Sequence, residues 1–179
     1  ILEIPKGGSA MNKFRTLTPD QLEDNVFRLI SKDWMLITAQ RKDGTANTMT
    51  ASWGSLGVNW GMPVATVYIR HSRYTLPFVD EAEGFSLCVF GEEYRPQLAY
   101  CGKVSGRDED KIAKCGFTLA REDGIPYFEE ARLVFLCRKV YAQDMPADCF
   151  VDKGILDQWY KEGDHHRMVL GEITKVLAR

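Results

Sequence analysis

Residues 47–60, NTMTASWGSLGVNW, alternate small hydroxyl side chains with apolar ones before glycine, serine and asparagine take over between two tryptophans. Successive residues of a strand point to opposite faces, which groups Thr48, Thr50 and Ser52 against Met49, Ala51 and Trp53. The GSLG segment then leaves its backbone N–H groups little covered, so it can approach a flat ring and donate hydrogen bonds to ring carbonyls. A threonine-rich edge strand followed by a flexible loop gives the same pattern. Both interpretations stay open on composition alone.

A second segment, YIRHSRYT at residues 68–75, could bind phosphate. Two guanidinium groups, those of Arg70 and Arg73, fall at the junction between a strand and the next segment, with Ser72, Tyr74 and Thr75 interleaved. Forked guanidinium donors and a helix N-terminus both favour a dianion. A solvated basic surface is the alternative interpretation of the same residues.

Two further segments carry polar side chains that could reach a ligand. CGKVSGRDEDK at residues 101–111 places Lys103 and Ser105 on a glycine-framed loop, and we expect Asp108 to cap the following helix. GDHHRMVLGEI at residues 163–173 places His165 and His166 directly before an apolar run. Surface histidines without a ligand fit this last pattern equally well.

The sequence contains none of the common motifs for phosphate-loop, dinucleotide, hydrolase-elbow or zinc-protease sites. Histidine-based catalysis can use only His71, His165 and His166. If the protein is an enzyme, we therefore expect a cofactor to supply the reactivity.

Composition bounds the class of protein. Of 179 residues, 45% are hydrophobic and 27% charged, which suits one globular domain. The net charge of −2 argues against a nucleic-acid or membrane-surface partner, and the sequence lacks a long apolar run for a membrane span. We interpret residues 1–10 as a tag or vector remnant, Met11 as the natural start and residues 11–179 as a single domain.

The cysteines form neither a CxxC pair nor a cluster with histidine at metal spacing. They are Cys88, Cys101, Cys115, Cys137 and Cys149. We expect free thiols in a reducing cytoplasm. Cys88 and Cys137 lie in apolar runs, where cysteine acts as a small buried hydrophobe.

The groups named above must be positioned by strands that follow one another in the sequence as hairpins. A helix is predicted over residues 19–31, with Thr18 as cap, and shorter helices are predicted at 73–84, 94–104 and 108–115. Residues 124–131 are predicted to form a bend with a short edge piece. Strands are predicted at residues 34–40, 46–53, 63–70, 85–90, 132–143 and 167–178. Asp43-Gly44 suits a tight turn between the first two strands. The pattern indicates a mainly β protein, an antiparallel barrel with helices packed outside.

Taken together, MTASWGSLG, RHSRYT, GKVSGRDEDK and DHHRMVLGEI resemble, in this order, the flavin reductase-like family with its FMN-binding split β-barrel. The resemblance implies an antiparallel split barrel, FMN bound without a covalent link, and a homodimer. It implies that residues matching Met49, Thr50, Ala51, Ser52, Trp53, Ser55 and Leu56 border the flavin ring. It implies that Arg70, Arg73, Tyr74 and Thr75 hold the ribityl phosphate, and that Lys103 and Ser105 reach the flavin. Counting back from Gly171 places His166 at the family's histidine position, with His165 where relatives carry aspartate.

The expected function is that of an FMN-dependent oxidoreductase, in which NADH or NADPH docks transiently and passes hydride to the flavin. His166 would orient the nicotinamide or release a proton. The alternative is an FMN-binding electron carrier or sensor without its own NADH or NADPH oxidation. A third possibility is that the protein is a split barrel that binds no flavin.

Overall fold

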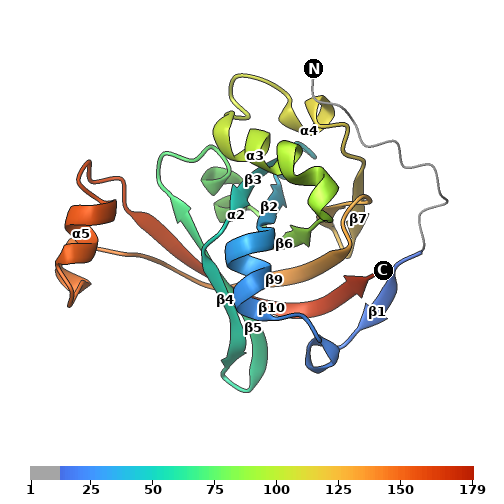
Figure 1. The fold of residues 1–179 in the computed structure, drawn as a ribbon, viewed down its shortest axis with the longest axis horizontal. Helices are drawn as coiled ribbons and strands as arrows, with labels where there is room; N and C mark the ends of the chain where they lie inside the picture. Colours follow the sequence, from blue (N-terminus) through green and yellow to red (C-terminus); the bar gives the residue numbers. More distant parts are fainter. Residues whose placement is uncertain (1–12) are drawn as a thin grey trace.

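The computed structural model describes residues 13–179, and one large antiparallel sheet organises them (Figure 1). Its strand order is β3-β2-β6-β9-β10-β5-β4, and β1 pairs with β10 outside this path. The strands are β1 (Arg15–Leu17), β2 (Met35–Gln40), β3 (Ala46–Ala51), β4 (Gly54–Asn59), β5 (Met62–Arg70), β6 (Gly84–Val89), β9 (Leu133–Asp144) and β10 (His166–Ala178). A separate hairpin joins β7 (Leu119–Glu122) to β8 (Ile125–Phe128). The predicted mainly β, antiparallel class is confirmed.

The two end strands of this sheet are neighbours in the sequence. β3 and β4 terminate the strand order at opposite ends, yet only Ser52 and Trp53 separate Ala51 from Gly54. Two residues span only a few ångströms, so the sheet must curl until its edges meet there. In the described part of the chain β3 and β4 share no ladder, so the barrel is split along the line that begins at this point. We call residues 51–54 the seam.

The segment after the seam differs from its prediction. GSLG, expected as a loop, forms β4 and pairs with β5, in register from Gly54 opposite Val67 to Asn59 opposite Met62. Trp60 and Gly61 both have positive φ, 53° and 74°, which suits the two-residue turn of a tight hairpin. Pairing with β5 occupies one edge of β4, so only its outer edge and the seam itself leave backbone groups for a ligand.

The helices are short and lie around the barrel. They are η1 (Pro19–Gln21), α1 (Val26–Arg28), η2 (Leu29–Asp33), α2 (Leu76–Glu81), η3 (Glu92–Tyr94), α3 (Arg95–Lys103), α4 (Lys111–Lys114), η4 (Ala147–Cys149) and α5 (Gly154–Trp159). No helix among the described residues is long and apolar enough to cross a membrane.

The single helix predicted over residues 19–31 is wrong. Thr18 does precede the first turn, but the chain becomes extended at Leu22, and a new helix starts after Asn25. The Asn25 side chain accepts a hydrogen bond from Arg28 N at 3.0 Å. Such local side-chain bonds compete with helix continuation. Leu29 and Ile30 are nevertheless buried, as the apolar pattern predicted.

Two smaller predictions also need correction. Asp110, and not Asp108, caps α4, since its Oδ1 accepts from Ala113 N at 3.1 Å. Residues 124–131, expected as a bend with a short edge piece, contribute β8 to a regular hairpin. The Asp43-Gly44 turn between β2 and β3 forms as predicted, with Gly44 at φ 87°.

Apolar side chains fill the barrel and a second layer outside it. Phe85, Phe135 and Ile37 belong to the inner cluster. An outer cluster, which includes Leu36, Leu98, Phe117 and Phe128, packs α3 and the β7–β8 hairpin onto the sheet. Cys88 and Cys137 are fully buried, as predicted.

One close approach inside the barrel depends on a glycine. A Cβ on Gly171 would lie 2.7 Å from Cys137 Cβ and 2.8 Å from Phe85 Cζ. Glycine therefore lets β10 pass close to β9 at the register shift between Leu170 and Gly171.

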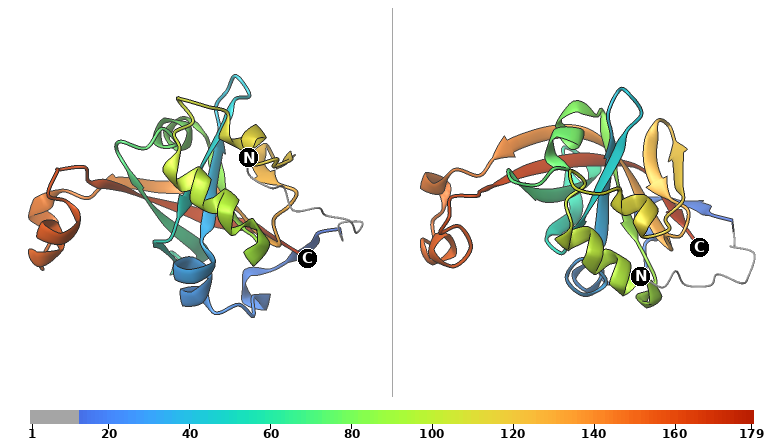
Figure 2. Two further views of the ribbon diagram at one scale, coloured as in Figure 1. Left: turned by 45° about the horizontal axis from the view of Figure 1, so that its top comes forward. Right: turned by 90° about the horizontal axis from the view of Figure 1, so that it is seen from above.

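Residues 145–165, which join the end of β9 to the start of β10, are here called the β9–β10 extension. They contain η4 and α5, and α5 lies to one side of the barrel body in all views (Figures 1 and 2). This extension returns the chain to the barrel at His166, which is in register with Arg70 of β5.

Candidate functional site

Two adjoining pockets form one cleft beside the seam. The first, about 350 Å³, is here called the aromatic pocket; it is lined by Met49, Thr50, Ala51, Ser52, Trp53, Tyr68, Arg70, Arg73, Trp159 and His166. The second, about 320 Å³, is called the cationic pocket; it is lined by Met49, Arg70, Ser72, Arg73, Tyr74, Thr75, Lys103, Val104, Ser105, Gly106, Arg107, Lys111 and Asp164. Met49, Arg70 and Arg73 belong to both, so the pockets are continuous.

Segments far apart in the sequence meet in this cleft. The seam contributes Ser52 and Trp53, the end of β5 contributes Arg70, and the start of β10 contributes His166. Ser52 and Arg70 line the same pocket, which is the proximity that a single ligand spanning both would require.

Aromatic rings make up one side of the aromatic pocket. The Trp53 ring lies 4.9 Å from the Trp159 ring at 86°, and 5.2 Å from the His166 ring. Trp53 and Trp159 remain 38% and 46% exposed. Exposed rings that meet edge to face present π surface to a flat ligand.

The His166 imidazole is held in one orientation. Its Nδ1 lies 2.7 Å from the Tyr160 hydroxyl, and the side chain is buried. Burial, and then the nearby Arg70 guanidinium, lower the pKa of His166 to about 4. In the neutral imidazole, Nδ1 either accepts from the Tyr160 hydroxyl, which places the ring proton on Nε2, or carries the proton and donates to it. His165 instead stacks on the Tyr160 ring at 4.8 Å.

Arg70 joins the cleft to the loop that follows α5. Its Nη1 donates to Asp164 O at 2.6 Å and its Nη2 donates to Trp159 O at 3.1 Å. The guanidinium also lies over the Tyr160 ring, 5.2 Å from its centre. Both terminal nitrogens of Arg70 therefore support the backbone that holds Trp159 in place.

The cationic pocket gathers five cationic side chains and one carboxylate. The cations are Arg70, Arg73, Lys103, Arg107 and Lys111, and the carboxylate is Asp164. The Asp164 carboxylate accepts from Ser72 N and from Ser72 Oγ at 3.1 and 2.7 Å. The excess of positive charge suits a dianionic phosphate.

Lys111 is the most buried of these cations. It is 4% exposed, and its Nζ donates to Cys101 O at 2.8 Å and to Val104 O at 2.9 Å. Burial lowers the pKa of Lys111. Arg73 Nη1 donates to Gly102 O at 2.8 Å. Lys111 and Arg73 thus tie the 101–111 loop to the pocket wall.

Two of the three hydroxyl groups predicted to share one face of the strand, those of Thr48 and Thr50, are used within the fold. Thr48 Oγ1 donates to Ile37 O at 3.0 Å, and Thr50 Oγ1 donates to Leu98 O of α3. Thr75 is 1% exposed and accepts from Asn47 Nδ2 at 3.0 Å. Thr50 and Thr75 still line the cleft, but their hydroxyls already have protein partners.

Two residues predicted for the flavin ring stand apart from this lining. Ser55 and Leu56 lie on β4 and are not among the residues that line either pocket. Their place in a paired strand follows from the correction of GSLG from loop to strand.

Several lining residues were absent from the predicted set. They include Tyr68, Trp159, Val104, Gly106, Arg107, Lys111 and Asp164. Arg107 and Lys111 fall inside the GKVSGRDEDK segment already singled out, so their charge was an available signal. Trp159 had no comparable signal, because the β9–β10 extension brings it to the seam.

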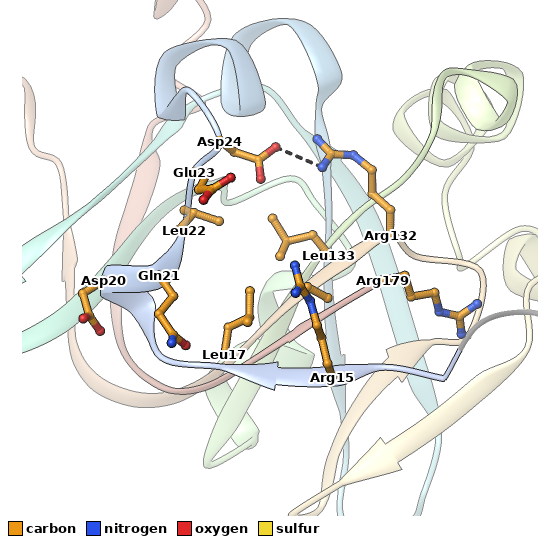
Figure 3. Close-up of a pocket in the computed structure, with 11 residues that line it drawn as sticks. Arg15, Leu17, Asp20, Gln21, Leu22, Glu23, Asp24, Arg132, Leu133 and Arg179 are labelled. Carbon is orange, nitrogen blue, oxygen red and sulfur yellow. Dashed lines mark hydrogen bonds and ion pairs between the residues drawn. The ribbon is translucent and has the colours of Figure 1, made fainter.

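Further pockets lie beside and beyond this cleft. An apolar pocket of about 490 Å³ adjoins the seam; it is lined by Phe27, Ile30, Ser31, Ser52, Trp53, Gly54, Tyr68, Met145, Phe150, Ile155 and Tyr160. Figure 3 shows a pocket of about 460 Å³ beside β1, where Arg132 pairs with Asp24 at 2.9 Å. None of the site residues predicted from the sequence lines the pocket beside β1.

Comparison with known proteins agrees with the split-barrel fold. The family described as flavin reductase like domain matches residues 27–179. Flavoredoxin from Methanosarcina acetivorans is similar in structure, with 26% identity, a TM-score of 0.66, and coverage of 82% of this chain and 68% of that chain.

More distant structures share the fold. An FMN-binding domain of a flavin reductases-like enzyme from Shewanella baltica OS155 has 17% identity and a TM-score of 0.68, covering 95% of this chain and 79% of that one. The styrene monooxygenase flavin reductase from Pseudomonas putida S12 has 14% identity and a TM-score of 0.59, covering 80% of this chain and 77% of that one.

A sequence relative is an uncharacterized protein of Archaeoglobus fulgidus, 30% identical over 96 residues. The match covers 52% of this chain and 54% of the relative, so it spans about half of that protein.

Proposed function

This chain belongs to the flavin reductase-like family, and on that premise we propose that its cleft binds FMN and serves the oxidation of NADH or NADPH. The observation that carries the proposal is the continuity of the two pockets, which share Met49, Arg70 and Arg73. A flavin mononucleotide has a flat ring and a dianionic phosphate at its two ends. An aromatic pocket that opens into a cationic one fits both ends.

The phosphate end fits the cationic pocket by charge. Arg73, Lys103, Arg107 and Lys111 would surround the dianion, and Lys111 is already oriented by its two backbone acceptors. Arg70 contributes its charge, although its terminal nitrogens also hold residues 159–164. Ser105 and Gly106 line the same wall and leave room beside the cations.

The ring end fits the seam. Bound FMN would supply a two-electron acceptor for hydride from the nicotinamide. Backbone N–H groups at Ser52 and Trp53 would meet negative charge on one edge of the ring. Trp53 and Trp159 would limit the access of water.

His166 is suited to positioning. The low pKa of His166 leaves the imidazole neutral at neutral pH, and a hydrogen bond donated by the Tyr160 hydroxyl to Nδ1 would keep the ring proton on Nε2. Such a ring donates one hydrogen bond from Nε2 toward a ligand in the aromatic pocket. This supports orientation of the nicotinamide over proton release as the role of His166.

Exposed apolar groups around the seam support a homodimer. Phe27 is 86% exposed and Ile155 40%, and both line the apolar pocket. The β9–β10 extension carries α5 away from the barrel, where a second copy could receive it (Figure 2). We propose a cytoplasmic homodimer without a nucleic-acid or membrane partner, consistent with the net charge of −2.

Anaerobic spectroscopy tests the proposal. The purified protein should take up FMN, with a change in its visible spectrum, and NADH or NADPH should bleach the bound flavin rapidly. Photoreduction provides the control. If light bleaches the flavin but neither nucleotide does, the protein is an electron carrier or sensor; if FMN does not bind at all, the proposal fails.

A further inference from the structure

We propose that Cys101 and Cys115 form a reversible disulfide that fixes the loop carrying the cations of the cleft. The two Sγ atoms lie 3.6 Å apart. Both residues are buried in the cluster between α3 and the sheet, at 0% and 1% exposure. A disulfide bond measures about 2.05 Å, so the sulfurs would approach by about 1.5 Å.

The pair encloses the loop that matters for the cleft. Residues 102–114 lie between the two cysteines, and they include Lys103, Ser105, Arg107 and Lys111 of the cationic pocket. Cys101 sits in α3, whose Leu98 O accepts from Thr50 at the end of β3. A cross-link would therefore join the end of α4 to α3, which is itself hydrogen-bonded to β3 through Leu98 and Thr50.

The other cysteines lack this arrangement. Cys88 and Cys137 are buried on β6 and β9, and burial raises the pKa of both thiols, that of Cys88 to about 11. Cys149 is exposed in η4. It serves as an internal reference for a surface thiol.

The surroundings make Cys115 the attacking thiolate. The hydrogen bond from the Cys101 thiol lowers the pKa of Cys115, and the Lys111 ammonium acts in the same direction. The same hydrogen bond, together with burial, raises the pKa of Cys101. Lys111 also lines the cationic pocket, so the ammonium group that acts on the pKa of Cys115 belongs to the cleft.

A hydroperoxide is the oxidant that the step requires. The Cys115 thiolate attacks one peroxide oxygen, the O–O bond breaks, and hydrogen peroxide gives a sulfenic acid on Cys115 and one water after protonation. The Cys101 sulfur then attacks the Cys115 sulfur, the S–O bond breaks, and a second water leaves with the Cys101 proton. Two thiols lose two electrons and two protons, and the peroxide gains them.

The test uses the full chain with the substitution Cys149→Ser, which removes the exposed thiol. After treatment with hydrogen peroxide and alkylation of remaining thiols, mass spectrometry should find one peptide pair joined through Cys101 and Cys115. Dithiothreitol should release it. Cys115→Ala in the same background should yield no cross-link, while Cys88→Ala should leave the cross-link in place.

Hydrogen exchange tests the effect on the loop. A cross-link over a loop of this length should slow the exchange of amides in residues 102–114 by about tenfold or more. Amides of β9 should not change. Oxidation of either thiol to a sulfinic acid without a cross-link would overturn the proposal, as would a cross-link that leaves loop exchange unchanged. Neither readout needs flavin, so they remain decisive even if the proposed function fails.

Discussion

The Tyr160 hydroxyl lies 2.7 Å from His166 Nδ1, and the two groups share one hydrogen bond. Tyr160 follows α5, at the far end of the β9–β10 extension, whereas His166 opens β10 at the cleft. The extension thus reaches the proposed site through Tyr160 as well as through Trp159 and Asp164.

The substitution Tyr160→Phe should release the tautomer of His166. In the native protein the imidazole should be a single Nε2–H form, and the variant should mix both neutral tautomers because Nδ1 loses its donor. Nitrogen-15 chemical shifts of the ring at neutral pH report this directly. Unchanged shifts in a variant that melts like the native protein would show that Tyr160 does not set the tautomer.

Acid should destabilise the protein through His166. Its pKa falls from 6.5 in the unfolded chain to about 4 in the fold. Between these values the unfolded state binds a proton that the native state does not, so stability is complete above about pH 6.5 and is lost as pH falls toward 4. The loss attributable to this group should reach about 3 kcal/mol.

Urea unfolding between pH 7 and about pH 4.5 measures this loss. The variant His166→Gln has no titrating ring, so the difference between the two proteins in how the free energy of unfolding changes with pH isolates the histidine. If that free energy fell equally with pH in both proteins, His166 would titrate normally in the fold.

Arg73 and Arg70 should differ in what they contribute to ligand binding. Arg73→Gln should weaken FMN by about 1.5–3 kcal/mol, or roughly 10- to 100-fold, and riboflavin much less, because only FMN carries the dianion. Arg70→Gln should weaken both ligands, since Arg70 also holds Trp159 O and Asp164 O. Titration calorimetry with each ligand measures the two affinities. If Arg73→Gln weakened the binding of FMN and riboflavin equally, Arg73 would not contact the phosphate.

Gly171→Ala should destabilise the barrel. The new methyl group would meet Cys137 Cβ at 2.7 Å and Phe85 Cζ at 2.8 Å, with no free space on either side. Overpacking of this kind costs about 1–3 kcal/mol. Gly57→Ala on β4 is the matched control, because nothing lies within 4 Å of its added Cβ. Its free energy of unfolding should change by less than about 0.5 kcal/mol, and a similar loss in both variants would refute the packing argument.

Phe27→Asp should weaken the proposed dimer. Phe27 is 86% exposed and lines the apolar pocket beside the seam, so a charge there would oppose burial by a second copy. Val151 is 100% exposed and is not among that pocket's lining residues, which makes Val151→Asp the control. Sedimentation velocity should show a dimer for the native protein and the control, and a monomer for Phe27→Asp. A native monomer would end the dimer proposal.

Local signals in the sequence were enough for much of the fold. Asp43-Gly44 and the apolar runs on either side gave the β2–β3 hairpin, because turn chemistry and alternation act within a few residues. The break near Leu22 and the pairing of GSLG were missed. In the first, capping by Asn25 outweighed an apolar period; in the second, pairing with β5 outweighed a loop-like composition.

The site was harder to foresee than the fold. The resemblance to the flavin reductase-like family implied that Arg70, Arg73, Lys103 and Ser105 reach one ligand, and in the structure these residues line one pocket. The hydrogen bonds of Arg70 to backbone oxygens near α5 depend on the long extension, which no local pattern encodes. Long-range geometry of this kind appears only when the whole sheet is assembled.

Because the chain crosses from one edge of the sheet to the other within Ser52 and Trp53, inserting a residue there would shift both rims of the cleft at once. Evolution toward a different ligand therefore has little freedom at this crossing. The loop at 101–111 and the tip beyond β9 can lengthen or change charge without disturbing a ladder of the barrel, so new specificities should arise in those two places.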